Sequence, residues 1–219
     1  MSNLQPFIFV SPPEGRGYKA KSCKFDIGVH LRYNMCKEVS ALDRSTTCAF
    51  TGHREPKLPW RGNENDSRCL LLKQSIYDAA EAVYQSGIRH FICGMATGCD
   101  TYFCEAVMFL RESREDVTIE CAIPWEGQSE RWTARQRRRY DRLACECDFR
   151  TVLQRDYTDG CFIRRNRYMV DSASVLIAAY DGRQGGTRST ILYAIRQGLQ
   201  VIELPILETI PQNDRTVCL

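Results

Sequence analysis

Short runs of apolar and β-branched residues alternate with amphipathic stretches from about residue 46 onward. The apolar runs predict six strands, at residues 47–50, 90–93, 118–123, 149–153, 174–179 and 200–204. Between the first two, apolar side chains recur with the spacing of one helical face, at Leu72, Ile76, Ala79, Ala80 and Val83. Strands that alternate with helices are typical of β-α-β units. We therefore expect an α/β, Rossmann-like fold with a mainly parallel sheet flanked by helices.

Local signals mark where two of these helices begin or end. Asp66 or Ser67 is expected to cap the first helix, because both side chains accept hydrogen bonds from backbone N–H groups at a helix start. A last helix is predicted over 190–197, and Gly198 follows it in the position of a left-handed cap.

Residues 1–45 do not follow this alternation. Turn-forming residues occupy positions 11–15, and residues 20–43 show no sustained period. We interpret 1–45 as an N-terminal extension, expected to be poorly ordered, and place the Rossmann-like domain at 46–219. Two origins of the extension stay open: a native tail, or an upstream segment if translation begins at Met35.

Composition limits the classes of protein. The chain has 219 residues, enough for one well-buried core, and is 43% hydrophobic and 26% charged. No apolar run approaches the ~20 residues of a membrane span. The start of the chain shows no export signal, so we expect a cytoplasmic protein. A net charge of +3 is too small to indicate nucleic-acid binding by itself.

The cysteine pattern favours reduced thiols over a disulfide framework. Of twelve cysteines, Cys48, Cys93, Cys104 and Cys121 fall at expected core positions, where a thiol packs as a small hydrophobic group. Because no Cys-x-x-Cys pair occurs, we expect no metal site and no cofactor.

Three glycine-bearing loops follow strands of the predicted sheet, at residues 51–54, 94–100 and 181–187. The carboxyl ends of parallel strands gather at one edge of a sheet, which is where open α/β folds bind ligands. Glycine lets the backbone approach a ligand, and a helix start offers unpaired N–H groups to an anion. The loops therefore predict a phosphate site. A Walker lysine motif and a Gly-x-Gly-x-x-Gly fingerprint are both absent, which disfavours a P-loop NTPase or a dinucleotide dehydrogenase.

Single side chains in these loops have alternative interpretations. His53 is either a general base or phosphate donor, or a cap of its loop. Asp100 either meets the dipole of the following helix or holds a ribose hydroxyl. Arg54 is suited to a charge-assisted contact with a phosphate.

Four segments together resemble the YpsA-like branch of the SLOG superfamily: residues 49–54, 94–100, 165–171 and 185–194. The resemblance covers about 48–204 and implies a Rossmann-like fold that binds a nucleotide or nucleotide-derived ligand at the glycine loops. The superfamily also contains DprA single-strand DNA-binding proteins and LOG phosphoribohydrolases. The loops and the resemblance together give the candidate ligand-binding residues, namely Thr51, Gly52, His53, Arg54, Gly94, Met95, Gly98, Asp100, Arg165, Asn166, Asp171, Gly185, Gly186, Thr187 and Thr190.

One departure from the LOG pattern concerns activity. The LOG enzymes carry Gly-Gly-x-Gly-Thr-x-x-Glu, and here Arg188 and Leu192 stand at the third glycine and the glutamate. Leucine cannot transfer a proton, so LOG-type hydrolysis is disfavoured, and Asp100, Asp171 or Asp181 would have to substitute. Whether the chain is an enzyme stays open at this point.

Three functions are compatible with these residues. We first expect a binding or sensing domain, in which a nucleotide-derived phosphate ligand alters an interaction with a protein partner or within a homo-oligomer. The alternative is hydrolysis of an N-glycosidic or phosphoester bond, with His53 or an aspartate as base. We rank single-stranded nucleic-acid binding third. It rests on arginines at helical spacing with two aromatic neighbours, namely Arg131, Arg135, Arg138 and Arg142 with Trp132 and Tyr140.

Overall fold

The computed structural model describes residues 43–209 of the chain. Most of the expected N-terminal extension lies outside these residues. The described part opens on a 3-10 turn, Arg44–Thr46, whose first residue already contacts the domain: Arg44 Nε donates to the Ala173 carbonyl at 2.8 Å. Asp43 and Arg44 therefore contribute hydrogen bonds to the domain, although they precede the expected boundary at residue 46.

The six predicted strands form one sheet in which all the paired strands run parallel. Their order is β4-β3-β2-β1-β5-β6. The α/β, Rossmann-like prediction is confirmed. The strands are β1 Thr47–Gly52, β2 His90–Cys93, β3 Thr118–Ile123, β4 Phe149–Val152, β5 Val175–Tyr180 and β6 Gln200–Pro205.

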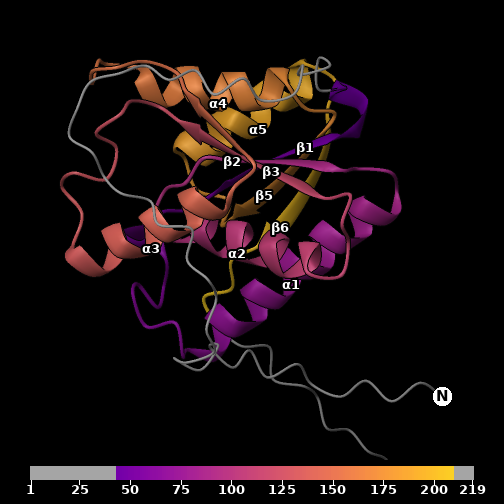
Figure 1. Cartoon of the computed structure of the whole chain (residues 1–219). Helices are drawn as coiled ribbons and strands as arrows, with labels where there is room; N and C mark the ends of the chain where they lie inside the picture. The colour runs from indigo at the N-terminus through magenta and orange to yellow at the C-terminus, as the bar shows by residue number, and fades with distance from the viewer. Residues whose placement is uncertain (1–42, 210–219) are drawn as a thin grey trace, which may run out of the picture. The chain divides into compact units, whose positions relative to one another are not determined.

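Helices cover both faces of the sheet (Figure 1). Alternation along the strands assigns side chains to the two faces. Cys48 and Phe50 of β1 point to one cluster of buried residues, and Ala49 between them points to the other. The helices are α1 Ser67–Gln85, α2 Cys99–Arg111 and α3 Ala134–Glu146 on the first face, and α4 Cys161–Asp171 and α5 Gly186–Arg196 on the second.

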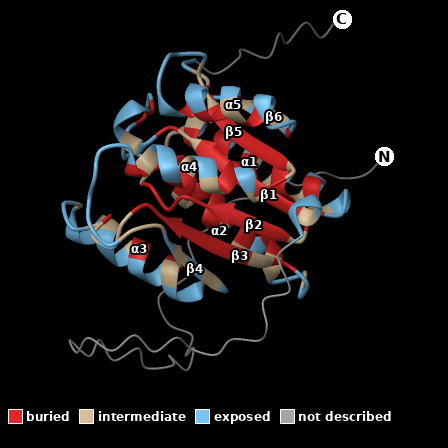
Figure 2. Ribbon diagram, turned by 90° about the horizontal axis from the view of Figure 1, so that it is seen from above, coloured by how far each residue is buried: buried red, intermediate tan, exposed pale blue. Residues whose placement is uncertain are grey.

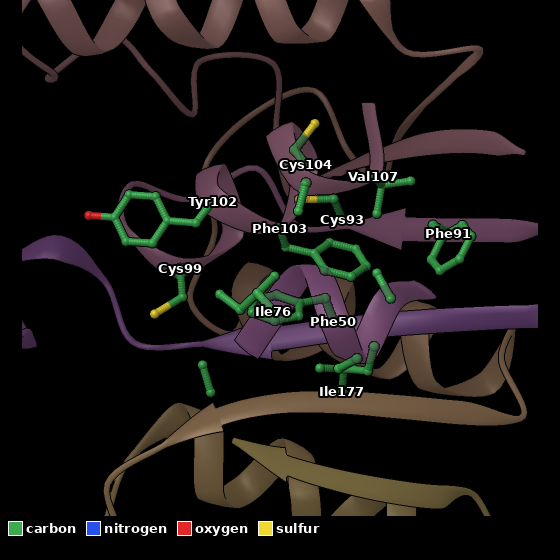
Figure 3. Close-up of a cluster of buried hydrophobic side chains, with 14 of the residues drawn as sticks. Phe50, Ile76, Phe91, Cys93, Cys99, Tyr102, Phe103, Cys104, Val107 and Ile177 are labelled. Carbon is green, nitrogen blue, oxygen red and sulfur yellow. The ribbon is translucent and has the colours of Figure 1, made fainter. Parts of the chain in front are cut away.

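The larger cluster is the core between the sheet and helices α1 and α2 (Figure 3). Phe50 stacks on Phe103 of α2 with ring centroids 4.4 Å apart. The cysteines expected in the core are fully buried, as predicted. Figure 2 shows the inner strands buried and the outer faces of the helices exposed. In the part of the chain that the structure describes, no helix is both long and apolar enough to cross a membrane.

Helix boundaries follow the predicted caps with one difference. The Asp66 side chain accepts from the Arg68 N–H and caps α1, and Gly198 has a left-handed φ of 77° after α5. Helix α5, however, begins at Gly186, four residues earlier than predicted. Glycine and hydroxyl residues are weak helix formers, so the pattern does not reveal the first turn.

Strand order places a crevice at one point of the sheet. The chain leaves β1 towards β2 on one side, and β5 later pairs with β1 on the other side. The connections that follow β1 and β5 therefore diverge, which leaves a topological switch point at the carboxyl ends of these strands.

Candidate functional site

A cavity of about 260 Å³ opens at the switch point between β1 and β5. Its walls come from the end of β1 and its loop, the loop before α2, the first turns of α2 and α5, one side of α4, and the short 3-10 turn Glu55–Lys57. Nine of the fifteen predicted site residues line it. The full lining is Phe50, Thr51, Gly52, His53, Arg54, Lys57, Ala96, Asp100, Phe162, Arg165, Asn166, Met169, Gly186 and Thr187.

The lining carries more positive than negative charge. Three cations, Arg54, Lys57 and Arg165, face a single carboxylate, that of Asp100. Arg54 lies over the ring of Phe162, with the guanidinium carbon 4.2 Å from the ring centroid. Within residues 43–209, neither Arg54 nor Lys57 forms an ion pair. Two exposed cations are therefore available to an anion in the cavity.

Arg165 and Asp100 form the buried floor of the site. Arg165 Nη1 lies 3.9 Å from Asp100 Oδ2 and donates to the Gly94 carbonyl. Burial raises the pKa of Asp100, against the opposing charge of Arg165 and the Ala96 N–H that donates to its carboxylate at 3.1 Å. Gly94 does not line the cavity. Its role is to leave room for the guanidinium, since a Cβ there would overlap Arg165 and lie 2.7 Å from Asp100 Oδ2.

His53 is held between two partners at the cavity wall. Its Nε2 lies 2.6 Å from Asp181 Oδ1, and its Nδ1 lies 3.2 Å from Thr187 Oγ1. Burial opposes ionisation of Asp181, but hydrogen bonds from His53 and the Arg183 N–H hold the pKa of Asp181 below its ordinary value. An ionised carboxylate only accepts, so Nε2 carries the proton. In the neutral ring, the Nδ1 lone pair accepts from the Thr187 hydroxyl.

Two predicted site residues join the loops instead of lining the cavity. Gly98, at φ 91°, packs against the backbone of the β1 loop, where a Cβ would lie 2.6 Å from the Glu55 nitrogen. The Cys99 N–H donates to the His53 carbonyl at 3.1 Å across this contact. Met95 is buried, and its carbonyl accepts from Gln128 Nε2 at 2.7 Å. Both residues therefore support the loops that carry the lining residues, without lining the cavity themselves.

Thr190 and Gly185 lie beside the cavity, and Asp171 lies away from it. Thr190 Oγ1 accepts from Asn166 Nδ2 at 2.8 Å, which ties α5 to α4. Gly185 precedes the first turn of α5. Asp171 instead bonds the Tyr193 hydroxyl at 2.8 Å, at the last residue of α4. Because α4 leads back to the start of β5, its last residue lies at the amino edge of the sheet, so Asp171 lies apart from the cavity that nine of the other candidate residues line.

Sequence reasoning missed Lys57, Phe162 and the pairing of Asp181 with His53. Lys57 follows Arg54 by three residues and lies in the short 3-10 turn Glu55–Lys57, which the sequence pattern did not predict. Phe162 sits in the first turn of α4, next to Arg165 in the same helix. The Asp181 contact joins the loop after β1 to the loop after β5. Only the strand order could have revealed it.

The four arginines on which the nucleic-acid interpretation rested do not all lie on one helical face. Arg131 precedes α3, which begins at Ala134. Trp132 and Tyr140 pack edge to face, with ring centroids 5.5 Å apart, and Tyr140 is buried. Both aromatic side chains therefore pack against the larger core cluster.

Several known proteins are similar to this chain over more than half of its length. The SPbeta prophage-derived protein YoqJ of Bacillus subtilis is 26% identical over 138 residues, which cover 57% of this chain and 81% of YoqJ. A UPF0398 protein of Bacillus pumilus is 22% identical over 146 residues, covering 66% and 77%. The structure of DNA processing protein A from Streptococcus pneumoniae matches with a TM-score of 0.50 at 16% identity. That match covers 74% of this chain and about half, 51%, of the other, and shows a shared fold.

A family model for YpsA, described as the YspA SLOG family, matches residues 48–206. This range includes all six strands except Thr47, the first residue of β1, and all three glycine-bearing loops, each of which contributes residues to the cavity. The resemblance inferred from the sequence motifs is confirmed. The chain belongs to the YspA SLOG family.

Proposed function

We propose that the cavity binds a phosphate-bearing, nucleotide-like small molecule. The observation that carries the proposal is the charge of the lining: Arg54 and Lys57 are exposed cations without carboxylate partners among the described residues. An anion that enters the cavity meets both.

The first turn of α5 supplies backbone donors to the same anion. The first N–H groups of a helix have no intrahelical partner and carry the positive end of the helix dipole. Gly186 lines the cavity, and the space beside its Cα is open: a Cβ at this position would meet nothing within 4 Å. A phosphate oxygen therefore has unobstructed access to these N–H groups.

The remaining walls suit the sugar and base of a nucleotide. Asp100 and Asn166 offer polar atoms for ribose hydroxyls, and Phe162 offers an apolar ring beside Arg54. The volume of about 260 Å³ is just below the ~300–1,000 Å³ of typical small-molecule pockets. A phosphate and ribose fill such a space, with the base at the mouth.

The substitution Gly186→Asp tests this site. A carboxylate at that position lies next to the proposed phosphate and repels it by roughly 1 to 4 kcal/mol at about 4 Å. We expect at least about fivefold weaker binding of ribose 5-phosphate or a nucleoside monophosphate in calorimetry. Circular dichroism first confirms that the variant folds.

Arg138→Asp is the control, because Arg138 lies exposed on α3 and does not line the cavity. It should leave the affinity unchanged. Normal affinity in folded Gly186→Asp together with lost affinity in Arg138→Asp would move the site to α3. Native mass spectrometry of the protein purified from cells, which reveals a retained nucleotide by its mass, identifies the ligand itself.

A second candidate function is hydrolysis at the same cavity, favoured by the contact between His53 and Asp181. A histidine oriented by a carboxylate and facing a hydroxyl is the arrangement that activates nucleophiles. Leu192, which stands at the position of the LOG glutamate, cannot act as the base, and it is exposed and lies outside the lining of the cavity. His53 is therefore the base in this proposal, and Thr187 or a water that replaces its hydroxyl is the nucleophile.

Incubation with a nucleotide panel separates hydrolysis from binding. If the chain is a hydrolase, base or phosphate is released, and Asp181→Asn lowers kcat by at least tenfold while leaving the dissociation constant of the nucleotide within about twofold. If every compound stays intact while calorimetry shows binding, the hydrolase proposal is wrong and the binding proposal stands.

A further inference from the structure

Four thiols from four elements meet beneath α2. Cys93 ends β2, Cys104 lies in α2, Cys121 lies in β3 and Cys147 directly follows α3. Figure 3 shows Cys93 and Cys104 in the core. The Cys104 and Cys147 sulfur atoms are 3.9 Å apart. The first three residues are fully buried, whereas Cys147 is half-buried and accessible from solvent.

Arg111 fixes the position of Cys147 over α2. Its guanidinium donates to the Glu146 carbonyl at 2.9 Å and to Asp148 Oδ2 at 2.8 Å, so it holds the residues on both sides of Cys147. The Asp148 carboxylate in turn accepts from the Ile119 N–H at 2.8 Å. The short separation of the two sulfur atoms is therefore set by contacts from α2 and β3.

The environment of Cys147 favours its thiolate. Hydrogen bonds from the Cys104 and Cys121 thiols lower the pKa of Cys147, and the Arg111 charge acts in the same direction against burial and Asp148. The buried partner thiols keep their protons, since the pKa of Cys104 is raised. Cys147 is thus the nucleophile of the cluster, because the thiolate is the reactive form of cysteine.

We propose that Cys147 and Cys104 are a site of reversible disulfide formation driven by a peroxide. The Cys147 thiolate attacks one oxygen of hydrogen peroxide, which gives Cys147 sulfenic acid and hydroxide. The Cys104 sulfur then attacks the sulfenic sulfur. The S–S bond forms, the S–OH bond breaks, and water leaves with the Cys104 proton. The sum is two thiols and one peroxide to one disulfide and two waters. A dithiol reductant then reduces the disulfide and restores both thiols.

Only a short movement is needed to form the bond. The sulfur atoms must approach from 3.9 Å to the ~2.05 Å of a disulfide. The bond ties α2 to the end of α3. Among residues 43–209 no group of three or more cysteine, histidine or acidic side chains is arranged to hold a metal ion. The proposal rests on the separation of the two sulfur atoms and on the solvent access of Cys147.

Peptide mapping of the full chain tests the site. The protein is treated with one equivalent of hydrogen peroxide, alkylated, digested without reductant and analysed by mass spectrometry. We expect a linked peptide that joins Cys104 to Cys147 and disappears with dithiothreitol. A wild-type map in which Cys147 pairs with another cysteine, or in which both residues are alkylated, overturns the proposal without recourse to any variant.

Variants assign the order of the two steps. Cys147→Ser should consume peroxide at least tenfold more slowly than Cys145→Ser, the matched control at an exposed position of α3. Cys104→Ala, checked for folding by circular dichroism, should leave Cys147 as a sulfenic acid that dimedone traps. Equal rates in the Cys147 and Cys145 variants, or a disulfide that persists without Cys104, contradict the proposal.

Discussion

At the residue scale, two glycines from two similar loops, Gly94 and Gly186, have different roles. Gly94 sits beneath the Arg165 guanidinium, and Gly186 lines open space at the start of α5. Both looked like phosphate-binding glycines in the sequence. The neighbours that make the difference come from other elements, so a sequence pattern alone could not separate the two roles.

Alanine at each position tests this assignment. Gly94→Ala places a methyl group against Arg165 and Asp100, and we expect it to lower the free energy of unfolding by about 1–3 kcal/mol, as overpacked buried sites do. Gly186→Ala should change that free energy by less than about 0.5 kcal/mol, the usual range of surface substitutions. Urea unfolding of both variants measures the difference. Equal losses would show that the Arg165 contact does not restrict position 94.

Glu120 is a buried carboxylate that lies outside the lining of the cavity. It accepts from the Tyr168 hydroxyl at 2.6 Å and lies 3.0 Å from His90 Nε2. Burial alone would raise the pKa of Glu120, but hydrogen bonds from His90, Thr151 and Tyr168 hold it below the ordinary 4.5. A carboxylate with a lowered pKa stabilises the fold above its unfolded pKa, and this contribution is lost as the pH falls.

Glu120→Gln should therefore have a pH-dependent cost. At pH 7 we expect the free energy of unfolding to fall by about 1–3 kcal/mol, the range for hydrogen bonds to a charged buried group. Below pH 4.5 the wild type loses its own carboxylate contribution, so the gap between the two proteins should narrow. Urea titrations at pH 7 and pH 3.5 measure both gaps. A gap that stays constant would mean that the carboxylate is not the stabilising form.

At the element scale, periodicity predicted every strand and missed the first turn of α5. The inner strands β1, β2, β3 and β5 are buried on both faces, so their apolar pattern is continuous and bounded by turn residues, whereas the edge strands β4 and β6 alternate between more and less exposed positions. The first turn of α5 contains glycine and hydroxyl residues because it faces a cavity instead of the core. The pattern was thus least informative where the candidate site lies.

The placement of site residues depended on the direction of their elements. The last residues of β1 and those directly after it had to reach the carboxyl edge, and four of them, Thr51, Gly52, His53 and Arg54, line the cavity. Helix α4 crosses from one edge to the other, so Arg165 and Asn166 reach the cavity whereas Asp171 does not. The Asp181–His53 contact also needed the strand order β2-β1-β5, which the sequence does not state.

The start of α3 provides a prediction for an element. Thr133 forms a capping box with Gln136, in which each side chain bonds the backbone of the other. The arginine-rich helix buries only Tyr140 and Leu143, so its end contacts matter more than in α1 or α2. We expect Thr133→Ala to lower the free energy of unfolding by about 1 kcal/mol. Thermal and urea unfolding measure this. No loss in either would show that Arg139, bound to Glu64 and Glu105, suffices to hold the helix.

At the scale of the whole domain, one switch in strand order determines where chemistry is possible. Helices α1 and α2 cover one face and α4 and α5 the other, so side chains on the strands are enclosed. The carboxyl ends of β1 and β5 stay open between these layers, and the cavity lies there. The thiol cluster lies under α2, whose first turn also carries Asp100. A single helix therefore carries both a residue of the cavity lining and one cysteine of the proposed disulfide.

The boundary of the folded domain gives the last prediction. Residues 1–42 lack a sustained apolar face in the sequence, so a chain that starts at Asp43 should melt within about 2 °C of the full chain. Removing Asp43 and Arg44 as well deletes the bonds from Arg44 to the Ala173 and Gln197 carbonyls, at 2.8 and 3.0 Å. Charged hydrogen bonds of this kind, partly exposed here, contribute roughly 1–2 kcal/mol, or about 2–8 °C for a domain of this size. Calorimetry of the two truncations compares them directly. A large drop already at the first truncation would show that residues 1–42 pack against the domain, and no drop at the second would show that Arg44 contributes nothing to stability.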